Sequence, residues 1–107
     1  MRHGEVRWYL FKPPDKRRPV LILSRTSALG FLHAVTIAPI TSTIRDIPSE
    51  VFLSPTDGLL TTCAVNLDNI QTVPKAKLGP LITTLSTERM AEVKEAVSFA
   101  LGFDRLL

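Results

Sequence analysis

PVLILS, residues Pro19 to Ser24, contains the longest apolar run in this chain of 107 residues. An unbroken run of this length and composition predicts a short strand that is buried on both faces. Upstream, Val6 to Phe11 (VRWYLF) is rich in β-branched and aromatic residues and stops before Pro13-Pro14, where a strand cannot continue. The segment Pro14 to Arg17 (PDKR) has the composition of a turn. The chain therefore opens with two short strands.

More short strands are expected downstream, and one of them carries most of the polar residues of interest. They are Ala34 to Ile40, Val51 to Leu53, Ala64 to Val73 and Leu81 to Leu85. Ala64 to Val73 (AVNLDNIQTV) alternates apolar and polar residues, which is typical of a strand with one face inward. Its outward face shows Asn66, Asp68 and either Asn69 or Gln71, depending on where a bulge falls.

A single helix is expected near the C-terminal end. Ser86 is an N-cap residue type, Glu88 falls in the first turn and Gly102 is a stop signal. Between them, apolar residues recur at helical spacing and form one stripe: Met90, Val93, Val97, Ala100 and Leu101. Such a stripe packs on a core far more often than it binds a cofactor. We therefore expect an α+β fold that is mainly β, with the helix packed on the strands.

Length and composition bound the kind of protein. A chain of 107 residues is long enough for one domain and too short for two, so residues 1–107 are taken as one domain. The single cysteine, Cys63, excludes an internal disulfide and a thiolate metal cluster within one chain, which favours a reducing cytoplasm. No apolar run reaches the length of a signal peptide or a membrane span. The expected location is cytoplasmic, with no membrane partner.

Positive charge is concentrated at one end of the chain. The net charge is +3, yet residues 1–25 hold seven Lys or Arg and two acidic residues, whereas the remainder holds six and eight. Basic clusters attract phosphate backbones through counterion release. A charge run is also commonly a solvated surface, so charge alone leaves nucleic-acid binding as one of two interpretations.

No metal or cofactor signature is present. The sequence lacks a glycine-rich phosphate loop, a pair of His at metal-ligand spacing and a Cys pair, so we expect no metal and no cofactor. His33 fits a surface loop better than the role of a general base. Ser24 and Ser42 lack the glycine-flanked turn that exposes a hydrolase nucleophile.

A polar set at strand ends remains, formed by Arg18, Thr41 with Ser42, and Asp68. An arginine, a hydroxyl and a carboxylate suit the attack of a ribose 2′-hydroxyl on its own phosphate. The carboxylate takes the proton, and the other two groups stabilise charge on the phosphorane oxygens. By itself the set is a weak signal, because an arginine beside a proline at the start of a strand is more often structural or solvated.

The ordered segments of the chain resemble the MazF/PemK toxin family over essentially its whole length. They are GEVRWYLF, RRPVLILS, VTIAPITST, EVFLSPTDGL and AVNLDNIQTVPKAKLG, followed by the amphipathic helix, and RPVLILS, APITS and DNIQTV-x-K-x-KLG are the most specific. The resemblance implies a small SH3-like (CcdB/PemK-like) barrel and a homodimer with the RNA groove across its interface. It also implies a MazE-like antitoxin with an acidic tail as partner.

The activity implied by the resemblance is metal-independent, sequence-specific cleavage of single-stranded RNA that leaves a 2′,3′-cyclic phosphate and a 5′-hydroxyl. Messenger RNA is the first substrate to consider, with ribosomal and transfer RNA as alternatives. The family's catalytic arginine falls on Arg18, its phosphate-binding threonine on Thr41 and its acidic residue on Asp68. Among the remaining polar candidates, the cations are expected to hold the RNA backbone: Lys12, Lys16 and Arg17. The amides are expected to contact bases: Asn66, Asn69 and Gln71. Ser42, which follows Thr41, is a further RNA-binding candidate.

Several positions depart from the family pattern and keep two alternatives open. The stretch PPDKR replaces a longer Gly-x-Glu-Gln loop, Asn66 stands where some members have a second arginine, and Asn69 stands where most have Gln. One alternative is a CcdB-like protein that binds DNA gyrase and cleaves nothing, although the chain lacks the C-terminal Trp of that group. The other is a degenerate member that binds only RNA or an antitoxin.

Overall fold

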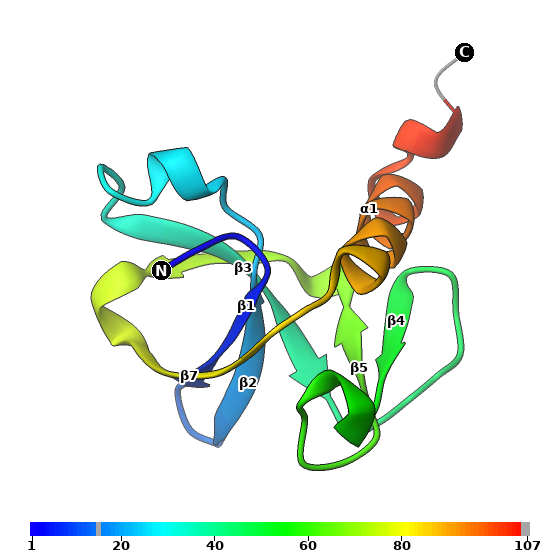
Figure 1. Ribbon diagram of the computed structural model, residues 1–107, viewed down its shortest axis with the longest axis horizontal. Helices are drawn as coiled ribbons and strands as arrows, with labels where there is room; N and C mark the ends of the chain where they lie inside the picture. Colours follow the sequence, from blue (N-terminus) through cyan, green and yellow to red (C-terminus); the bar gives the residue numbers. More distant parts are fainter. Residues whose placement is uncertain (15, 106–107) are drawn as a thin grey trace.

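The computed structural model describes residues 1–14 and 16–105, which form one antiparallel sheet and one α-helix (Figure 1). The strands are β1 (Glu5–Leu10), β2 (Arg17–Ile22), β3 (Ala34–Thr41), β4 (Glu50–Leu53), β5 (Cys63–Asn66), β6 (Gln71–Pro74) and β7 (Leu78–Thr84), and the helix is α1 (Thr87–Leu101). The expected α+β class, mainly β with one helix near the C-terminus, is confirmed. Asp15, in the predicted turn, lies outside the described residues.

The sheet is open, so the expectation of a closed barrel is wrong. The strand order is β4-β5-β3-β2-β1-β7, and β6 pairs with β3 beside β5. Among the described strands, the end strands β4 and β7 share no backbone ladder. A side-chain hydrogen bond joins β7 to the β4–β5 connection instead. Thr83 Oγ1 on β7 donates to the backbone carbonyl of Asp57 in that connection, at 3.1 Å.

The stretch from Ala64 to Val73 forms two strands instead of one, which corrects the prediction of a single bulged strand. A 3₁₀ turn, Leu67–Asn69, separates β5 from β6. The turn forms because Leu67 is 1% exposed in the core and Asn66 Oδ1 accepts the backbone N–H of Asp68 at 3.0 Å. As a result, β6 pairs with the first half of β3 and β5 pairs with its end, at Ile40 and Thr41.

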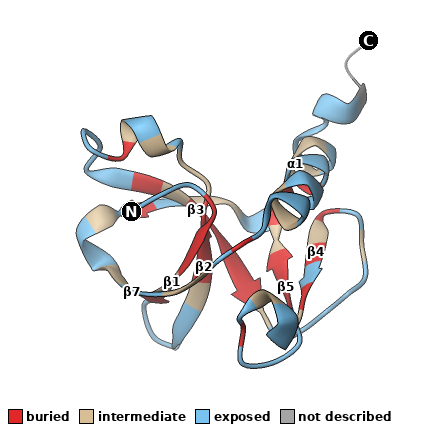
Figure 2. Cartoon of the chain, in the orientation of Figure 1, coloured by how far each residue is buried: buried red, intermediate tan, exposed pale blue. Residues whose placement is uncertain are grey.

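The strand β2 is buried on both faces from Val20 to Ile22, as predicted from PVLILS (Figure 2). Its alternate residues enter two different cores. Leu21 belongs to the larger core, which also contains Val6, Leu53 and Val65 and is covered by α1. Val20 and Ile22 belong to a smaller core with Tyr9 and other apolar residues of β3 and β6. Because both faces are covered, a change in the register of β2 would expose one core or the other.

The helix starts and stops at the predicted residues. Ser86 Oγ accepts the backbone N–H of Arg89, and Gly102 ends the helix with a left-handed φ of 81°. Val93 and Ala96 are buried, with Met90, Val97 and Ala100 packed against the core at partial burial. Leu101, predicted in the apolar stripe, is instead 58% exposed. Within the described part of the chain, no helix combines the length and apolarity needed to cross a bilayer.

Candidate functional site

Two neighbouring strands place Arg18 and Thr41 opposite each other. In the β2–β3 ladder Val20 pairs with Pro39 and Leu21 with Ala38. Extending this antiparallel register by two residues brings Arg18 opposite Thr41, the last residue of β3. Arg18 is exposed and Thr41 is half-buried, so both residues reach the surface.

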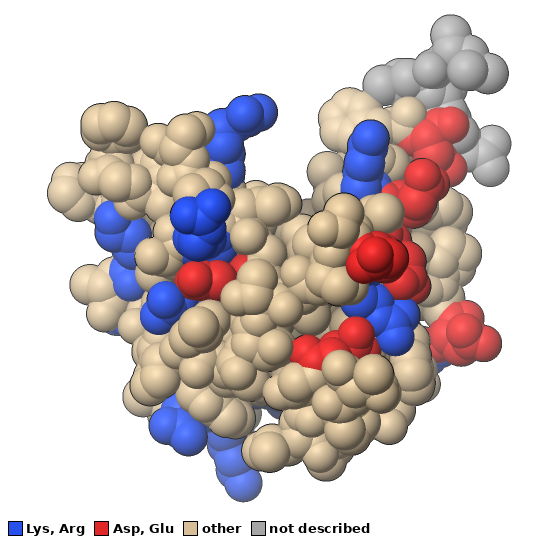
Figure 3. All heavy atoms as spheres, in the orientation of Figure 1, with Lys and Arg blue, Asp and Glu red and all other residues tan. Residues whose placement is uncertain are grey.

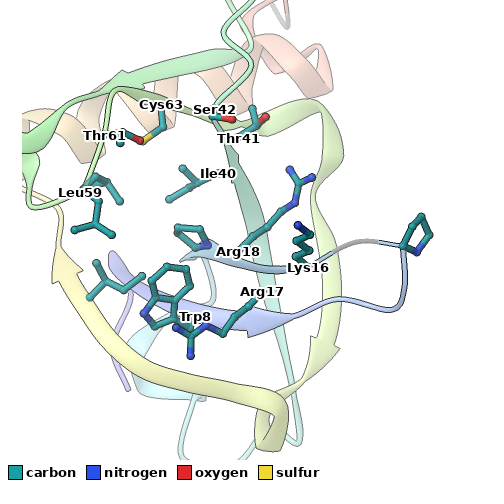
Figure 4. A pocket seen from close by; sticks show the side chains of 14 residues that line it. Trp8, Lys16, Arg17, Arg18, Ile40, Thr41, Ser42, Leu59, Thr61 and Cys63 are labelled. Carbon is teal, nitrogen blue, oxygen red and sulfur yellow. The ribbon is translucent and has the colours of Figure 1, made fainter.

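These two residues line two adjoining hollows. The larger, which we call the large groove, has a volume of about 480 Å³. The smaller, the polar hollow, has a volume of about 320 Å³. Figure 4 shows the Arg18 side chain extending across the large groove toward Thr41 and Ser42. An extended ligand that passed from one hollow to the other would cross the Arg18–Thr41 pair.

Polar side chains from three segments line the polar hollow. They are Arg18, Thr41, Thr43, Arg45, Asn66 and Asn69. Glu50, whose side chain is 3% exposed, orients Arg45: its carboxylate accepts from the Arg45 backbone N–H at 2.9 Å and from the Arg45 Nε at 3.3 Å. The Asn66 side chain is held in place because its Oδ1 accepts the backbone N–H of Asp68 in the following turn. The hollow therefore offers arginine and amide groups, which suit phosphate and base edges.

One wall of the large groove is the β4–β5 connection, and α1 holds it in place. Its groove-facing residues are Leu59, Leu60 and Thr61. Just before them, Asp57 accepts a hydrogen bond from Arg89 Nε at 2.9 Å. This bond to Arg89 is the main reason that the pKa of Asp57 lies below its usual value, outweighing the opposite effect of burial. The pair keeps its charges at neutral pH and ties the groove wall to the helix.

Cys63 also lines the large groove, but it is not a nucleophile of this site. Its side chain is 6% exposed, and burial raises the pKa of the thiol, with a smaller contribution from Asp57. The thiol therefore stays protonated at neutral pH. Within residues 1–14 and 16–105, no group of three or more His, Cys, Asp and Glu side chains is placed to hold a metal ion.

The charge asymmetry of the sequence persists on the folded surface. In Figure 3 the carboxylates gather over α1 and the connection beside it, whereas Lys and Arg spread over the side that carries β1 and β2. Lys16, Arg17 and Arg18 line the large groove together. Cations next to an open groove attract a phosphodiester chain and reduce its repulsion from the acidic helix.

The structure brings together most of the site residues expected from the sequence, but not all. Lys16, Arg17 and Ser42 line the large groove, and Asn66 and Asn69 line the polar hollow. Asp68, Lys12 and Gln71 line neither. The Asp68 carboxylate instead accepts a hydrogen bond from Ser49 Oγ, a residue that is 2% exposed. His33 is exposed on its loop, as expected.

Several residues of the site were missed in the sequence. Trp8, Leu59, Leu60 and Ile82 line the large groove, and Arg45 lines the polar hollow. They come from segments far apart in the chain, so spacing gives no signal for them. The one usable signal was Trp8, a large aromatic residue in a strand that is followed along the chain by a basic segment.

The fold and the site are those of a small, mainly β protein in which an arginine and a threonine from two antiparallel strands line the same open groove. Comparison with known proteins shows the family. The profile of the "PemK-like, MazF-like toxin of type II toxin-antitoxin system" matches residues 2–101. The chain therefore belongs to this family, and the resemblance seen in the sequence is confirmed.

Curated relatives and solved structures agree with this assignment. Endoribonuclease MazF3 of Mycobacterium tuberculosis is 40% identical over 90 residues, covering 84% of this chain and 87% of the relative. The probable endoribonuclease MazF5 of the same species is 38% identical over 103 residues, covering 95% and 94%. The solved M. tuberculosis toxin MazF-mt6 superposes with a TM-score of 0.85 at 36% identity, covering 92% of this chain and 96% of that chain.

A second solved structure bears on partners. An endoribonuclease from a mycobacterial species, solved in complex with its cognate antitoxin, superposes with a TM-score of 0.85 at 30% identity. The match covers 95% of each chain.

Proposed function

We propose that this chain is the toxin of a type II toxin–antitoxin pair and an endoribonuclease that cuts single-stranded RNA. Its relatives of 40% and 38% identity carry the name endoribonuclease, with the second named as probable. Their activity favours RNA cleavage over the gyrase-binding alternative. Messenger RNA is the first substrate to test, followed by ribosomal and transfer RNA.

The observation that carries the proposal is the placement of Arg18 opposite Thr41, lining both hollows. In the proposed reaction the ribose 2′-oxygen forms a bond to phosphorus while the bond from phosphorus to the 5′-oxygen breaks. The Arg18 guanidinium and the Thr41 hydroxyl donate hydrogen bonds to the phosphorane oxygens. The products are a 2′,3′-cyclic phosphate and a free 5′-hydroxyl, and RNA itself supplies the nucleophile.

We propose Asp68 as the base, and this role requires its side chain to move. Its carboxylate accepts a hydrogen bond from Ser49 and lines neither hollow. To take the 2′-proton it has to leave Ser49 and turn toward the polar hollow, which Asn69, the next residue in the same 3₁₀ turn, already lines. The leaving 5′-oxygen takes up a proton from water, and Asp68 releases the 2′-proton to solvent after the reaction.

The partners follow from the family. By analogy with the mycobacterial complex, the proposed partner is a small MazE-like antitoxin with an acidic segment, drawn to the basic side of the protein. We also propose a homodimer, because the small cores of a chain of 107 residues leave large apolar side chains such as Phe31, 83% exposed, at the surface. The proposed location is the cytoplasm.

The activity is tested by incubating the purified protein with a long RNA in EDTA and mapping the new 5′ ends. Cuts are expected at a limited set of unpaired sequences, with 5′-hydroxyl ends that a polynucleotide kinase labels without prior phosphatase treatment. RNA left intact by a folded preparation would reject the proposed activity.

The site is tested by Arg18→Ala. We expect cleavage to fall by about 100- to 1000-fold, the usual loss when one charge-stabilising donor is removed, while thermal melting shows that the protein still folds, because Arg18 is exposed and belongs to neither core. Arg25→Ala is the matched control, since Arg25 is also exposed and lines neither the large groove nor the polar hollow. Equal activity in the two variants contradicts the assignment of Arg18.

A further inference from the structure

The Arg17 guanidinium lies over the Trp8 ring, and the two residues, which we call the stack, come from adjacent strands. The guanidinium carbon of Arg17 lies 4.4 Å from the centroid of the Trp8 ring, which is a cation–π contact. The β1–β2 ladder builds this contact, because Trp8 pairs with Pro19 and Leu10 pairs with Arg17. Trp8 is half-buried and Arg17 is exposed, so the stack stands at the surface.

The stack lies in the large groove, next to the phosphate-binding pair. Trp8, Arg17, Arg18 and Thr41 all line this groove. In Figure 4 Trp8 and Arg17 lie together at one end, and Thr41 lies at the other, with the Arg18 side chain extending toward it. A group that occupied the Trp8 end would therefore adjoin a phosphate held at the Arg18 end.

The walls around the stack are apolar, which decides what can bind there. They are formed by Pro19, Leu59, Leu60 and Ile82, and Leu60 is 84% exposed. A phosphate held against these apolar walls would lose water that they cannot replace with hydrogen-bond donors. A flat aromatic group would instead cover apolar surface and stack on the exposed part of the indole and guanidinium. The expectation that Arg17 contacts the RNA backbone is therefore less favoured than contact with a base.

We propose that Trp8 and Arg17 form a stacking platform for the unpaired base next to the phosphate held by Arg18 and Thr41. The proposal rests on the proposed function, since it concerns the RNA bound at the same site. Stacking tolerates every base, because each has an aromatic face. The platform contributes affinity for a single strand, and it disfavours a duplex, in which each base is already stacked on its neighbours.

The single tryptophan of the chain makes the platform directly observable. Short 2′-O-methyl oligonucleotides, which lack the nucleophile and cannot be cut, are titrated into the full-length protein while Trp8 fluorescence is recorded. The comparison is with abasic 2′-deoxyribose phosphate chains of the same length and charge. We expect the base-containing oligonucleotides to quench Trp8 and to bind roughly 5- to 150-fold more tightly than the abasic chains, the range for one stacked base.

Variants separate stacking from charge. With a fluorescently labelled oligonucleotide, Trp8→Leu should remove most of the advantage of base-containing over abasic chains, whereas Trp8→Phe should keep part of it. Arg17→Lys retains the charge but removes the planar guanidinium, so it should weaken binding of base-containing chains more than that of abasic ones. Arg25→Lys is the matched control. If Trp8→Leu does not fold, the proposal is still tested by comparing the affinities of the unmodified protein for base-containing and abasic chains.

The results distinguish failure of the platform from failure of the proposed nuclease. Base-dependent quenching in a protein that cuts no RNA supports the platform and rejects the nuclease. RNA cleavage combined with equal affinity for base-containing and abasic chains, and with unchanged Trp8 fluorescence, overturns the platform and leaves the nuclease standing. Trp8 fluorescence that responds to a purified antitoxin but to no oligonucleotide also overturns it, in favour of a protein contact.

Discussion

Arg89 on α1 and Asp57 in the β4–β5 connection form an ion pair of 2.9 Å that joins the helix to the wall of the large groove. Their side chains are 25% and 11% exposed, so the pair is partly shielded from solvent. Asp57 also accepts the backbone N–H of Ser54 at 2.9 Å, closing a capping box. The helix therefore contributes to the shape of a groove that it does not line.

Breaking this pair should loosen the groove wall. Asp57→Ala and Arg89→Ala are each expected to lower the free energy of unfolding, and their double-mutant cycle should give a coupling of about 1 kcal/mol, as for a partly buried charge-assisted hydrogen bond. The measurement is urea unfolding of the four proteins. Additive effects would mean that the two residues act independently. Arg89→Ala also loses its contact with Glu92, so Glu92→Ala serves as the control.

The pair also predicts acid sensitivity. The pKa of Asp57 is lowered by its hydrogen bond from Arg89, so its stabilising effect is fully present above the ordinary carboxyl value of 3.8. It is lost as the pH falls through the lowered pKa. Asp57→Asn should therefore lower the free energy of unfolding at neutral pH. The gap in this free energy between the variant and the unmodified protein should become smaller as the pH falls. Parallel stability curves for the two proteins between neutral and acidic pH would contradict this.

Gly58 is expected to tolerate no side chain. Its φ is +97°, and an added Cβ would lie 2.4 Å from Thr83 Oγ1, the hydroxyl that bridges to Asp57. Gly58→Ala should cost at least about 1 kcal/mol from the left-handed backbone alone, with a further loss from displacing Thr83. Gly30→Ala, where nothing lies within 4 Å, is the control and should be nearly neutral. Thermal melts of the two variants test the difference.

The role of Asp68 can be separated from its contact with Ser49. If Asp68 is the base, Asp68→Asn should lower cleavage by about 100-fold or more and alter the acidic side of its pH dependence. Ser49→Ala should then retain cleavage, because it frees the carboxylate. If the contact is only structural, both variants should lose stability to a similar extent and cleave at rates that track the folded fraction. Single-turnover cleavage over a range of pH, measured beside thermal melts, distinguishes the two results.

Local patterns in the sequence predicted most of the individual elements. The strand at PVLILS, its burial on both faces, the cap at Ser86 and the stop at Gly102 all depend on neighbouring residues, and each was found. The division of Ala64 to Val73 was not predicted, because it depends on Leu67 entering a core formed by distant strands. The open sheet was not predicted either, since closure depends on whether β4 and β7 meet.

The sequence by itself determined a mainly β fold of the MazF/PemK family, and it singled out Arg18 and Thr41. Only the tertiary structure decided that these residues line the same two hollows, that Asp68 contacts Ser49, and that Trp8 and Arg17 meet in the large groove. The physical reason is that residue type and spacing control the local backbone. Contacts between groups on different strands depend on register and on how two cores fill, and those are properties of the whole packed chain.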